Sequence, residues 1–290
     1  MFPKVPDQHK VGKPLIPNGL GVLFVLFTTV YLFLLYFLKL VETPASVSAP
    51  FTLAACVLFG GFMGLLDDWI DLKWRYKAFM PLIAALPLIY FALANSAIIR
   101  TSISLPLIGT IQFGAVYFYL IIPLIVMIVT NAVNMLGGLN GLESLCPAIV
   151  LLGLMVLSPS FYLLMLGPII FWLILTAFNI KGKIFVGNSG SFAIGLTVAS
   201  FAVIADLKFS LLISILPYIF NSSLILISIF LTRKKAKMTF DGNKVVSEHR
   251  RSLATIITYK RPLTEHQVVG IISLIVAAFT VLAVIIQFLT

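Results

Sequence analysis

Residues 64–77 read GLLDDWIDLKWRYK, in which three aspartates directly follow an apolar run and three basic residues come after them. Carboxylates this close together repel one another unless a cation neutralises them. If the segment stays helical, Asp67 and Asp71 share one face, four residues apart, with Asp68 beside them. Such a cluster suits oxygen ligation of Mg²⁺ or a carboxylate–lysine network around a phosphate. A helix end capped by solvated charge is the plainer alternative.

The composition around this cluster is that of a membrane protein. Of the 290 residues, 60% are hydrophobic and only 10% are charged, and the mean hydropathy is +1.11. Soluble domains of this length do not have such a composition, so we expect an all-α, polytopic membrane protein built as one domain, residues 1–290. Cys56 and Cys146 both lie in apolar runs, which favours buried thiols over a disulfide.

About nine apolar segments have the length and composition to cross a bilayer as helices. We expect these spans at about 19–40, 50–66, 78–98, 115–131, 142–157, 160–179, 189–206, 209–231 and 267–289. A weak alternation over 102–114, around Pro106 and Gly109, predicts a small β-hairpin on the outer surface. The N-terminus is polar and rich in proline, without the apolar core of a cleavable signal peptide.

The net charge of +10 is divided unequally between the two sides of such a bundle. With a cytoplasmic N-terminus, only Lys39, Arg100 and Lys208 fall outside, which follows the positive-inside rule and predicts a cell-membrane protein rather than a nucleic-acid-binding one. The polar segments gather on the inner side: the acid cluster at 67–71, then 131–143, 181–191 and 232–266. We therefore expect an active site that faces the cytoplasm, whereas a transporter more often carries polar groups at mid-membrane.

Two glycine-rich loops carry polar side chains on that inner side. The first, NAVNMLGGLNGLE, places Asn131 and Asn134 on one helix face before glycines that allow the backbone to approach a ligand closely. In the second, VGNSGS, either Asn188 or Ser189 would cap the helix that follows, or else supply an oxygen ligand. For the first loop, an ordinary connection between spans stays an alternative.

The long loop 232–266 contains two basic clusters. RKKAK at 233–237 is typical of a positive-inside anchor on anionic lipid. His249 and Arg250 lie farther from the membrane, and an arginine fork matches the oxygens of a phosphate. These two residues are therefore candidates for binding a pyrophosphate, with simple solvation as the alternative.

These pieces, in this order and on this side, resemble the polyprenyl-phosphate N-acetylhexosamine-1-phosphate transferase family. LLDDWIDLKWRYK resembles the family's aspartate-rich loop, and NAVNMLGGLNGLE resembles its asparagine-and-glycine loop, both in the form of the dolichyl-type members. DQHKVGKPLIPNGLG (7–21), which includes Lys13, resembles the segment before a family span. The resemblance covers nearly the whole chain, and dolichyl-type motifs on a short chain favour an archaeal member.

The resemblance implies an enzyme that moves N-acetylglucosamine-1-phosphate from a UDP-sugar to a polyprenyl, dolichyl-type phosphate and releases UMP. The implied cofactor is Mg²⁺, with Mn²⁺ as an alternative. The implied partners are the UDP-N-acetylhexosamine, the polyprenyl phosphate and membrane lipids, without nucleic acid, and a homodimer stays open.

The resemblance also implies roles for individual residues. Asp67 and Asp68 match the pair that orients or deprotonates the lipid phosphate, and Lys77 matches a lysine on the nucleotide diphosphate. Asn188 and Asn134 match positions at the metal. The residues implied in substrate binding are Asn131, Asn134, Asn140, Lys13, His249 and Arg250.

The chain departs from the family pattern at several positions. Asn188 stands where a metal-ligating Asp is usual, which predicts weaker Mg²⁺ binding and leaves a catalytically silent homologue open. Gly137 and Asn140 stand where the phospho-N-acetylmuramoyl-pentapeptide transferases have Asp, which argues against that substrate. Glu248 replaces a commonly basic residue, and nine spans are one fewer than usual. A muramoyl-pentapeptide-type transferase and a transporter of lipid-linked or anionic solutes are the remaining alternatives.

Overall fold

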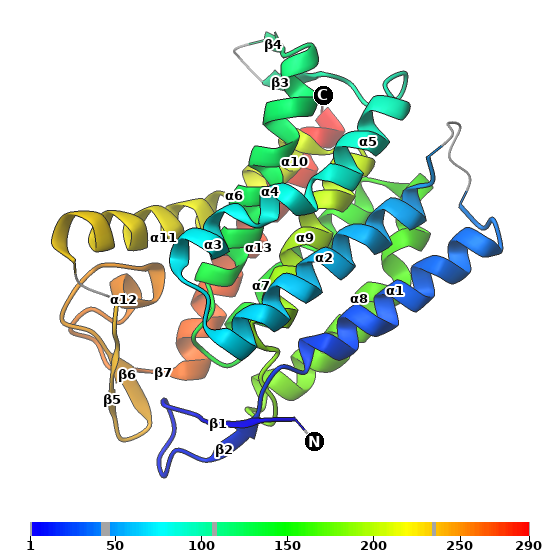
Figure 1. Ribbon diagram of the computed structural model, residues 1–290. Helices are drawn as coiled ribbons and strands as arrows, with labels where there is room; N and C mark the ends of the chain where they lie inside the picture. Colours follow the sequence, from blue (N-terminus) through cyan, green and yellow to red (C-terminus); the bar gives the residue numbers. More distant parts are fainter. Residues whose placement is uncertain (1, 42–46, 106–108, 234–235, 290) are drawn as a thin grey trace.

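The computed structural model describes residues 2–41, 47–105, 109–233 and 236–289. Most of these residues form helices, which Figure 1 shows as a bundle. Pro106 of the predicted hairpin and Lys234 and Lys235 of the predicted lipid anchor lie outside the described residues. The helices are α1 (Gly21–Phe37), α2 (Ala49–Ile70), α3 (Trp74–Phe79), α4 (Pro81–Ala84), α5 (Leu86–Ala94), η1 (Tyr117–Ile121), α6 (Ile122–Met135), α7 (Leu142–Val156), η2 (Pro159–Phe161), α8 (Tyr162–Ile180), α9 (Gly187–Ile204), α10 (Lys208–Ser214), α11 (Leu216–Ile227), η3 (Ser228–Thr232), α12 (Leu253–Ile257) and α13 (Glu265–Leu289).

Each of the nine predicted spans is helical. Within the described chain, six helical segments are long and apolar enough to cross a membrane, and the pair α10 and α11, bent by 56°, makes a seventh. The shorter apolar helices α1 and α7 occupy the two remaining predicted spans. The expected polytopic, helical fold is confirmed. The third span begins at Trp74 rather than at residue 78, so Lys77 lies in the first turns of this span and not in a loop.

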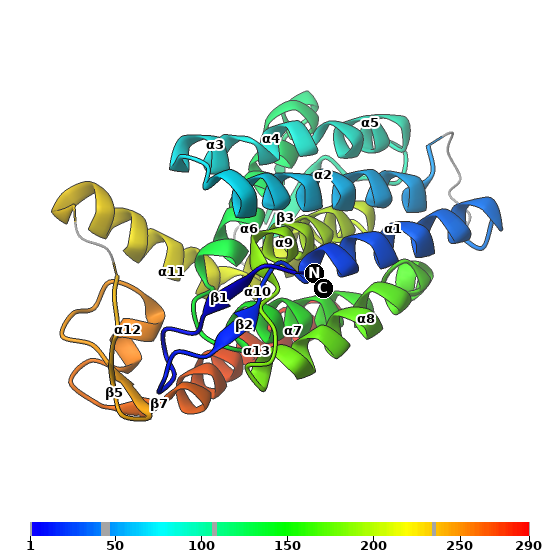
Figure 2. The same cartoon turned by 60° about the horizontal axis from the view of Figure 1, so that its bottom comes forward.

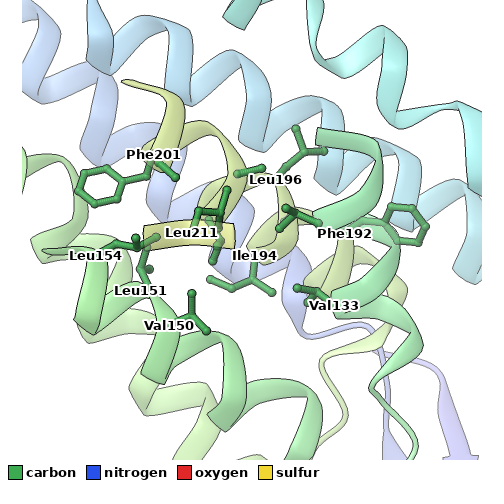
Figure 3. Close-up of a cluster of buried hydrophobic side chains, with 14 of the residues drawn as sticks. Val133, Val150, Leu151, Leu154, Phe192, Ile194, Leu196, Phe201 and Leu211 are labelled. Atoms are coloured by element: carbon green, nitrogen blue, oxygen red, sulfur yellow. The ribbon is translucent and has the colours of Figure 1, made fainter. Parts of the chain in front are cut away.

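The helix α9 forms the centre of the bundle. It packs against α1, α2, α6 and α7, and 89% of its span is buried. Figure 3 shows Phe192, Ile194, Leu196 and Phe201 of α9 among apolar side chains of α6, α7 and α10. A helix that is buried on all sides must be free of charged side chains all round, and α9 has none. Small residues alternate with its large apolar ones.

Glycines bring α1 and α2 into close contact with the beginning of α9. A Cβ at Gly64 of α2 would overlap the backbone oxygen of Asn188, and a Cβ at Gly21 would overlap the backbone of Gly190. Only glycine permits such an approach, because every other residue carries a Cβ. The polar end of α2 is thereby held directly against the first turn of α9.

Three small antiparallel sheets of the described residues accompany the helices. β3 (Ser102–Leu105) pairs with β4 (Gly109–Gln112), which confirms the hairpin predicted for 102–114. The sequence analysis did not predict the other two sheets, because their strands have two or three residues, too few for an alternating pattern. These strands are β1 (Lys4–Pro6) with β2 (Leu15–Pro17), and β5 (Thr239–Asp241) with β6 (Lys244–Val246) and β7 (Leu263–Thr264).

The segments between the helices gather at two ends of the bundle. β1, β2 and β5 to β7 lie at one end, and β3, β4 and the chain's C-terminus lie at the other (Figure 1). We call these the β1–β2 end and the far end. At the far end, Arg100 Nε lies 2.6 Å from Asp206 Oδ2, and Lys208 pairs with the same carboxylate. The polar loops that the sequence analysis assigned to one side of the membrane therefore lie at the β1–β2 end of the structure. These loops carry most of the basic residues.

Candidate active site

A cavity of about 300 Å³ lies at the β1–β2 end, where α9 begins. Figure 2 brings this end forward, with β1 and β2 in front of the helix ends. Segments distant in the sequence supply its walls: the N-terminal hairpin, the end of α2, the loop from α6 into α7, the end of α8 and the start of α9. The lining residues are Pro6, Asp7, Gln8, His9, Asn18, Asp68, Gly138, Leu139, Asn140, Glu143, Asn179, Phe185, Gly187 and Asn188.

Asp68 caps the helix that follows the second glycine-rich loop. The backbone N–H groups of Asn188 and Ser189 donate to its two carboxylate oxygens at 2.9 and 3.0 Å. A carboxylate at a helix N-terminus satisfies unpaired N–H groups and complements the helix dipole. The expectation that Asn188 or Ser189 caps α9 is wrong, because the helix already begins at Gly187 and its cap comes from α2.

Asp67 is buried and paired with Lys77. Lys77 Nζ lies 2.7 Å from Asp67 Oδ1, which also accepts the N–H of Leu72 at 3.0 Å, whereas Oδ2 has no hydrogen-bond partner among the described residues. Asp71 does not share a helix face with Asp67, because α2 ends at Ile70 and Asp71 adopts a left-handed conformation with φ 44°. Its side chain is 97% exposed, yet it also reaches Lys77 Nζ at 3.2 Å.

The two asparagines predicted at the metal are in direct contact. Asn134 Nδ2 donates to Asn188 Oδ1 at 3.0 Å and to Ser191 Oγ at 2.8 Å. Glu143, another residue of the cavity wall, interacts with the same serine. Asp68, Asn134 and Asn188 are therefore linked by consecutive hydrogen bonds, although Asn188 lies 120 residues from Asp68 and 54 from Asn134 in the sequence.

Asn140 lies in a buried polar cluster. Its side-chain nitrogen donates to Asp7 Oδ2 at 2.8 Å and to Glu265 Oε2 at 3.3 Å, and its backbone N–H donates to Glu265 Oε1 at 2.6 Å. Asn179 holds the neighbouring turn, because its Oδ1 accepts the N–H of Gly141 at 2.8 Å and its Nδ2 donates to Ile184 at 2.9 Å. The loop's N–H groups at Asn140 and Gly141 are therefore already satisfied by side chains and do not point free at a phosphate.

Of the predicted site residues, only Asp68, Asn140 and Asn188 line the cavity. Asn131 donates to the backbone oxygens of Ala78 and Met127 and so ties α6 to the end of α3. Lys13 is exposed in the turn between β1 and β2. His249 accepts the N–H of Lys237, and Arg250 stacks over the ring of Tyr259 at 4.2 Å. The last two contacts lie within the segment around β5 to β7, so the structure does not bring this basic loop to the cavity.

The oxygen-rich donors at the cavity fit a hard cation. The described residues contain no group of three or more His, Cys, Asp or Glu that could hold a metal ion. In the cavity wall they do offer carboxylate and amide oxygens at Asp68, Glu143 and Asn188. Asn134 contacts Asn188 from outside the set of lining residues. Mg²⁺ often takes only one or two carboxylates from the protein and completes its shell with water and substrate phosphates.

Comparison with known proteins identifies the family. The model of glycosyl transferase family 4 matches residues 50–206, which is more than half of the chain. The chain belongs to glycosyl transferase family 4. The matched region runs from the start of α2 to the end of α9 and includes Asp67, Asp68, Lys77, Asn134 and Asn188. The family resemblance expected from the motifs is confirmed.

Relatives in this family come from all three domains of life. A protein of Saccharolobus solfataricus, provisionally named UDP-N-acetylglucosamine–dolichyl-phosphate N-acetylglucosaminephosphotransferase, is 31% identical over 291 residues, covering 97% of this chain and 87% of that protein. A protein of Dictyostelium discoideum that bears this name is 24% identical over 255 residues, covering 74% and 62%. The phospho-N-acetylmuramoyl-pentapeptide-transferase of Oceanobacillus iheyensis is 27% identical over 253 residues, covering 80% and 74%.

Sequence reasoning missed three residues of the cavity wall, Asp7, Glu143 and Asn179, and also Glu265, which contacts Asn140. Asp7 and Glu265 lie outside the region matched by the family 4 model, and Asn179 and Glu143 lie within it. One signal could have found the acids: the chain has only ten Asp and Glu, so any acid beside an apolar span is unusual. Asn179 ends a long apolar helix, and its partners become evident only in the folded structure.

Proposed function

We propose that this protein transfers N-acetylglucosamine-1-phosphate from UDP-N-acetylglucosamine to a dolichyl-type polyprenyl phosphate. An oxygen of the lipid phosphate attacks the β-phosphorus of the UDP-sugar, the bond from that phosphorus to the α–β bridging oxygen breaks, and UMP leaves. The lipid then carries a diphospho-sugar. The observation that carries the proposal is the chain of contacts from Asp68 through Asn188 to Asn134 at a polar cavity, in a chain that belongs to glycosyl transferase family 4.

The names of the relatives support the choice of substrates. The relative from Saccharolobus solfataricus, whose provisional name specifies UDP-N-acetylglucosamine and dolichyl phosphate, aligns with 97% of the chain, against 80% for the bacterial pentapeptide transferase. The structure adds a physical reason at Asn140, where those bacterial enzymes are expected to have Asp. A carboxylate there would face Asp7 and Glu265 at hydrogen-bond distance and be repelled by both.

Mg²⁺ would be held by the amide oxygens of Asn188 and Asn134, with Asp68 beside them. When bound, it would supply positive charge to the diphosphate oxygens as charge develops on the leaving UMP. Asn188 brings no charge of its own, and its oxygen accepts a hydrogen bond from Asn134. Asn134 turns its NH₂ group toward Asn188, so its amide must reorient before both side chains can offer oxygen to one cation. This cost, added to the missing charge, supports the expectation of weak metal binding.

Positioning and charge neutralisation carry most of the catalysis in phosphoryl transfer, because the reaction requires little covalent help. Lys77, held by Asp67 and Asp71, would place an ammonium group near the phosphates. Asp67 and Asp68 would orient the lipid phosphate or take its proton. Among the described residues, Oδ2 of Asp67 has no hydrogen-bond partner, whereas both oxygens of Asp68 accept N–H groups. Asp68 is therefore suited to hold the site in shape, whereas Asp67 keeps one oxygen for a further contact.

The cavity would face the cytoplasm. In the described chain, most lysines and arginines lie in segments at the β1–β2 end, and Lys39, Arg100 and Lys208 lie in segments at the far end. An excess of basic residues marks the cytoplasmic side of membrane proteins. This orientation gives a soluble UDP-sugar direct access to the cavity, while the lipid phosphate reaches it from the bilayer.

The proposal is tested by incubating purified protein with labelled UDP-N-acetylglucosamine, a polyprenyl phosphate and Mg²⁺. Lipid-soluble label together with an equal amount of released UMP would support it. Parallel reactions with UDP-N-acetylmuramoyl-pentapeptide, and with vesicles that report solute flux, test the other two activities. A folded protein that binds the UDP-sugar without turnover would instead be a catalytically silent homologue, which Asn188 in place of a charged ligand would explain.

A further inference from the structure

The side-chain amide of Asn140 is fixed by acids from opposite ends of the chain. Its NH₂ group has two hydrogens, and Nδ2 donates both, to Asp7 Oδ2 at 2.8 Å and to Glu265 Oε2 at 3.3 Å. The second oxygen of Glu265 accepts the backbone N–H of Asn140 at 2.6 Å. Turning the amide over would replace both hydrogen bonds by contacts between oxygens. The two carboxylates therefore decide which way the amide points.

The oxygen end of the same amide has no hydrogen-bond partner among the described residues. Asn140 is only 3% exposed, and its Oδ1 accepts no hydrogen bond from the described residues, yet the residue lines the cavity. Buried acceptors are nearly always paired, because leaving one unsatisfied costs free energy. The wall of the cavity therefore contains a buried acceptor, and a donor of a bound molecule that reached this oxygen would satisfy it.

Asp7 is itself held in place by the turn of the N-terminal hairpin. Its Oδ1 accepts the N–H of His9 at 3.1 Å, its Oδ2 lies 3.4 Å from the ammonium of Lys10, and its own N–H donates to Pro14 at 3.0 Å. Glu265 is the first residue of α13. The hairpin and α13 thus meet at Asn140, although both lie outside the region matched by the family model.

We propose that Asp7 and Glu265 are positioning residues that turn Asn140 so that it offers only a hydrogen-bond acceptor to the cavity. The site therefore selects a ligand that brings an N–H or O–H donor to this point. The inference rests on the proposed function, because a UDP-N-acetylhexosamine carries such donors on its base, its ribose and its sugar. It extends that function by making the N-terminal hairpin and α13 part of substrate selection.

A double-mutant cycle tests this role. Binding of UDP-N-acetylglucosamine and of UDP to the full-length protein in detergent is measured by calorimetry, without relying on turnover. We expect Asp7→Asn and Asn140→Ala each to weaken binding of the UDP-sugar about tenfold, as for the loss of one buried hydrogen bond. Because Asp7 acts through Asn140, adding Asp7→Asn to Asn140→Ala should weaken binding less than about twofold further. Equal losses with UDP place the donor on the nucleotide, and losses confined to the UDP-sugar place it on the sugar.

A matched control separates positioning from a loosened hairpin. Val5→Ala weakens the β1–β2 pair without touching the amide, and its effect should be the same with Asn140 present or absent. The inference would be overturned if Val5→Ala weakened binding only when Asn140 is present, as Asp7→Asn is expected to do. Additive losses of binding from Asp7→Asn and Asn140→Ala would overturn it as well. Should Asp7→Asn fail to fold, Glu265→Gln completes the same cycle from α13. If the unsubstituted protein does not bind the UDP-sugar, the proposed function fails together with this inference.

Discussion

Replacing Asp68 by asparagine tests whether this carboxylate holds the site in shape. The side chain accepts two backbone N–H groups of α9 at 2.9 and 3.0 Å. Hydrogen bonds to a charged group contribute about 1.5–3 kcal/mol each, and a helix cap about 1 kcal/mol. Asparagine keeps one acceptor oxygen and turns an NH₂ group toward the other N–H. We therefore expect the Asp68→Asn variant to lose about 2 kcal/mol of free energy of unfolding.

The measurement is unfolding in mixed micelles with rising denaturing detergent, followed by circular dichroism. Asp71→Asn is the control. It makes the same chemical change three residues along the chain from Asp68, at a side chain that is itself 97% exposed. Exposed ion pairs contribute little, so this variant should unfold close to the unsubstituted protein. Equal losses in the two variants would refute the capping role of Asp68 and, with it, the coupling of α2 to Asn188.

Three further predictions concern residues at the same end of the bundle. Lys77→Met should destabilise the protein by about 3 kcal/mol, because it leaves Asp67 buried and unpaired; the added substitution Asp67→Asn should restore part of this loss in the same unfolding assay, and no restoration would argue against the pair. Asn188→Asp should lower the Mg²⁺ concentration that gives half-maximal transfer, and an unchanged Mg²⁺ titration would show that Asn188 is not a ligand. Gly64→Ala should destabilise by about 2 kcal/mol, since its methyl group overlaps the backbone of α9; an unaffected unfolding curve would contradict the close packing.

The sequence was sufficient to place helices at all nine predicted spans, because a bilayer requires long apolar segments and these can be counted along the chain. It also predicted the hairpin at 102–114 and the sorting of polar loops to one end. The same sequence did not reveal the strands β1, β2 and β5 to β7, since two or three residues carry no usable period. Nor did it predict that α2 ends at Ile70, which removes Asp71 from the face of Asp67.

The site shows where the sequence alone is not sufficient. Asp67, Asp68, Lys77, Asn134 and Asn188 could be nominated from the sequence, because polar residues beside apolar spans are costly unless they have a use. Which of them touch was decided by the close packing of α1 and α2 on α9, which glycines allow. The roles of Asp7 and Glu265 were also set by tertiary structure alone. Each depends on a partner more than a hundred residues away, and a hydrogen bond depends on distance in space rather than on separation along the chain.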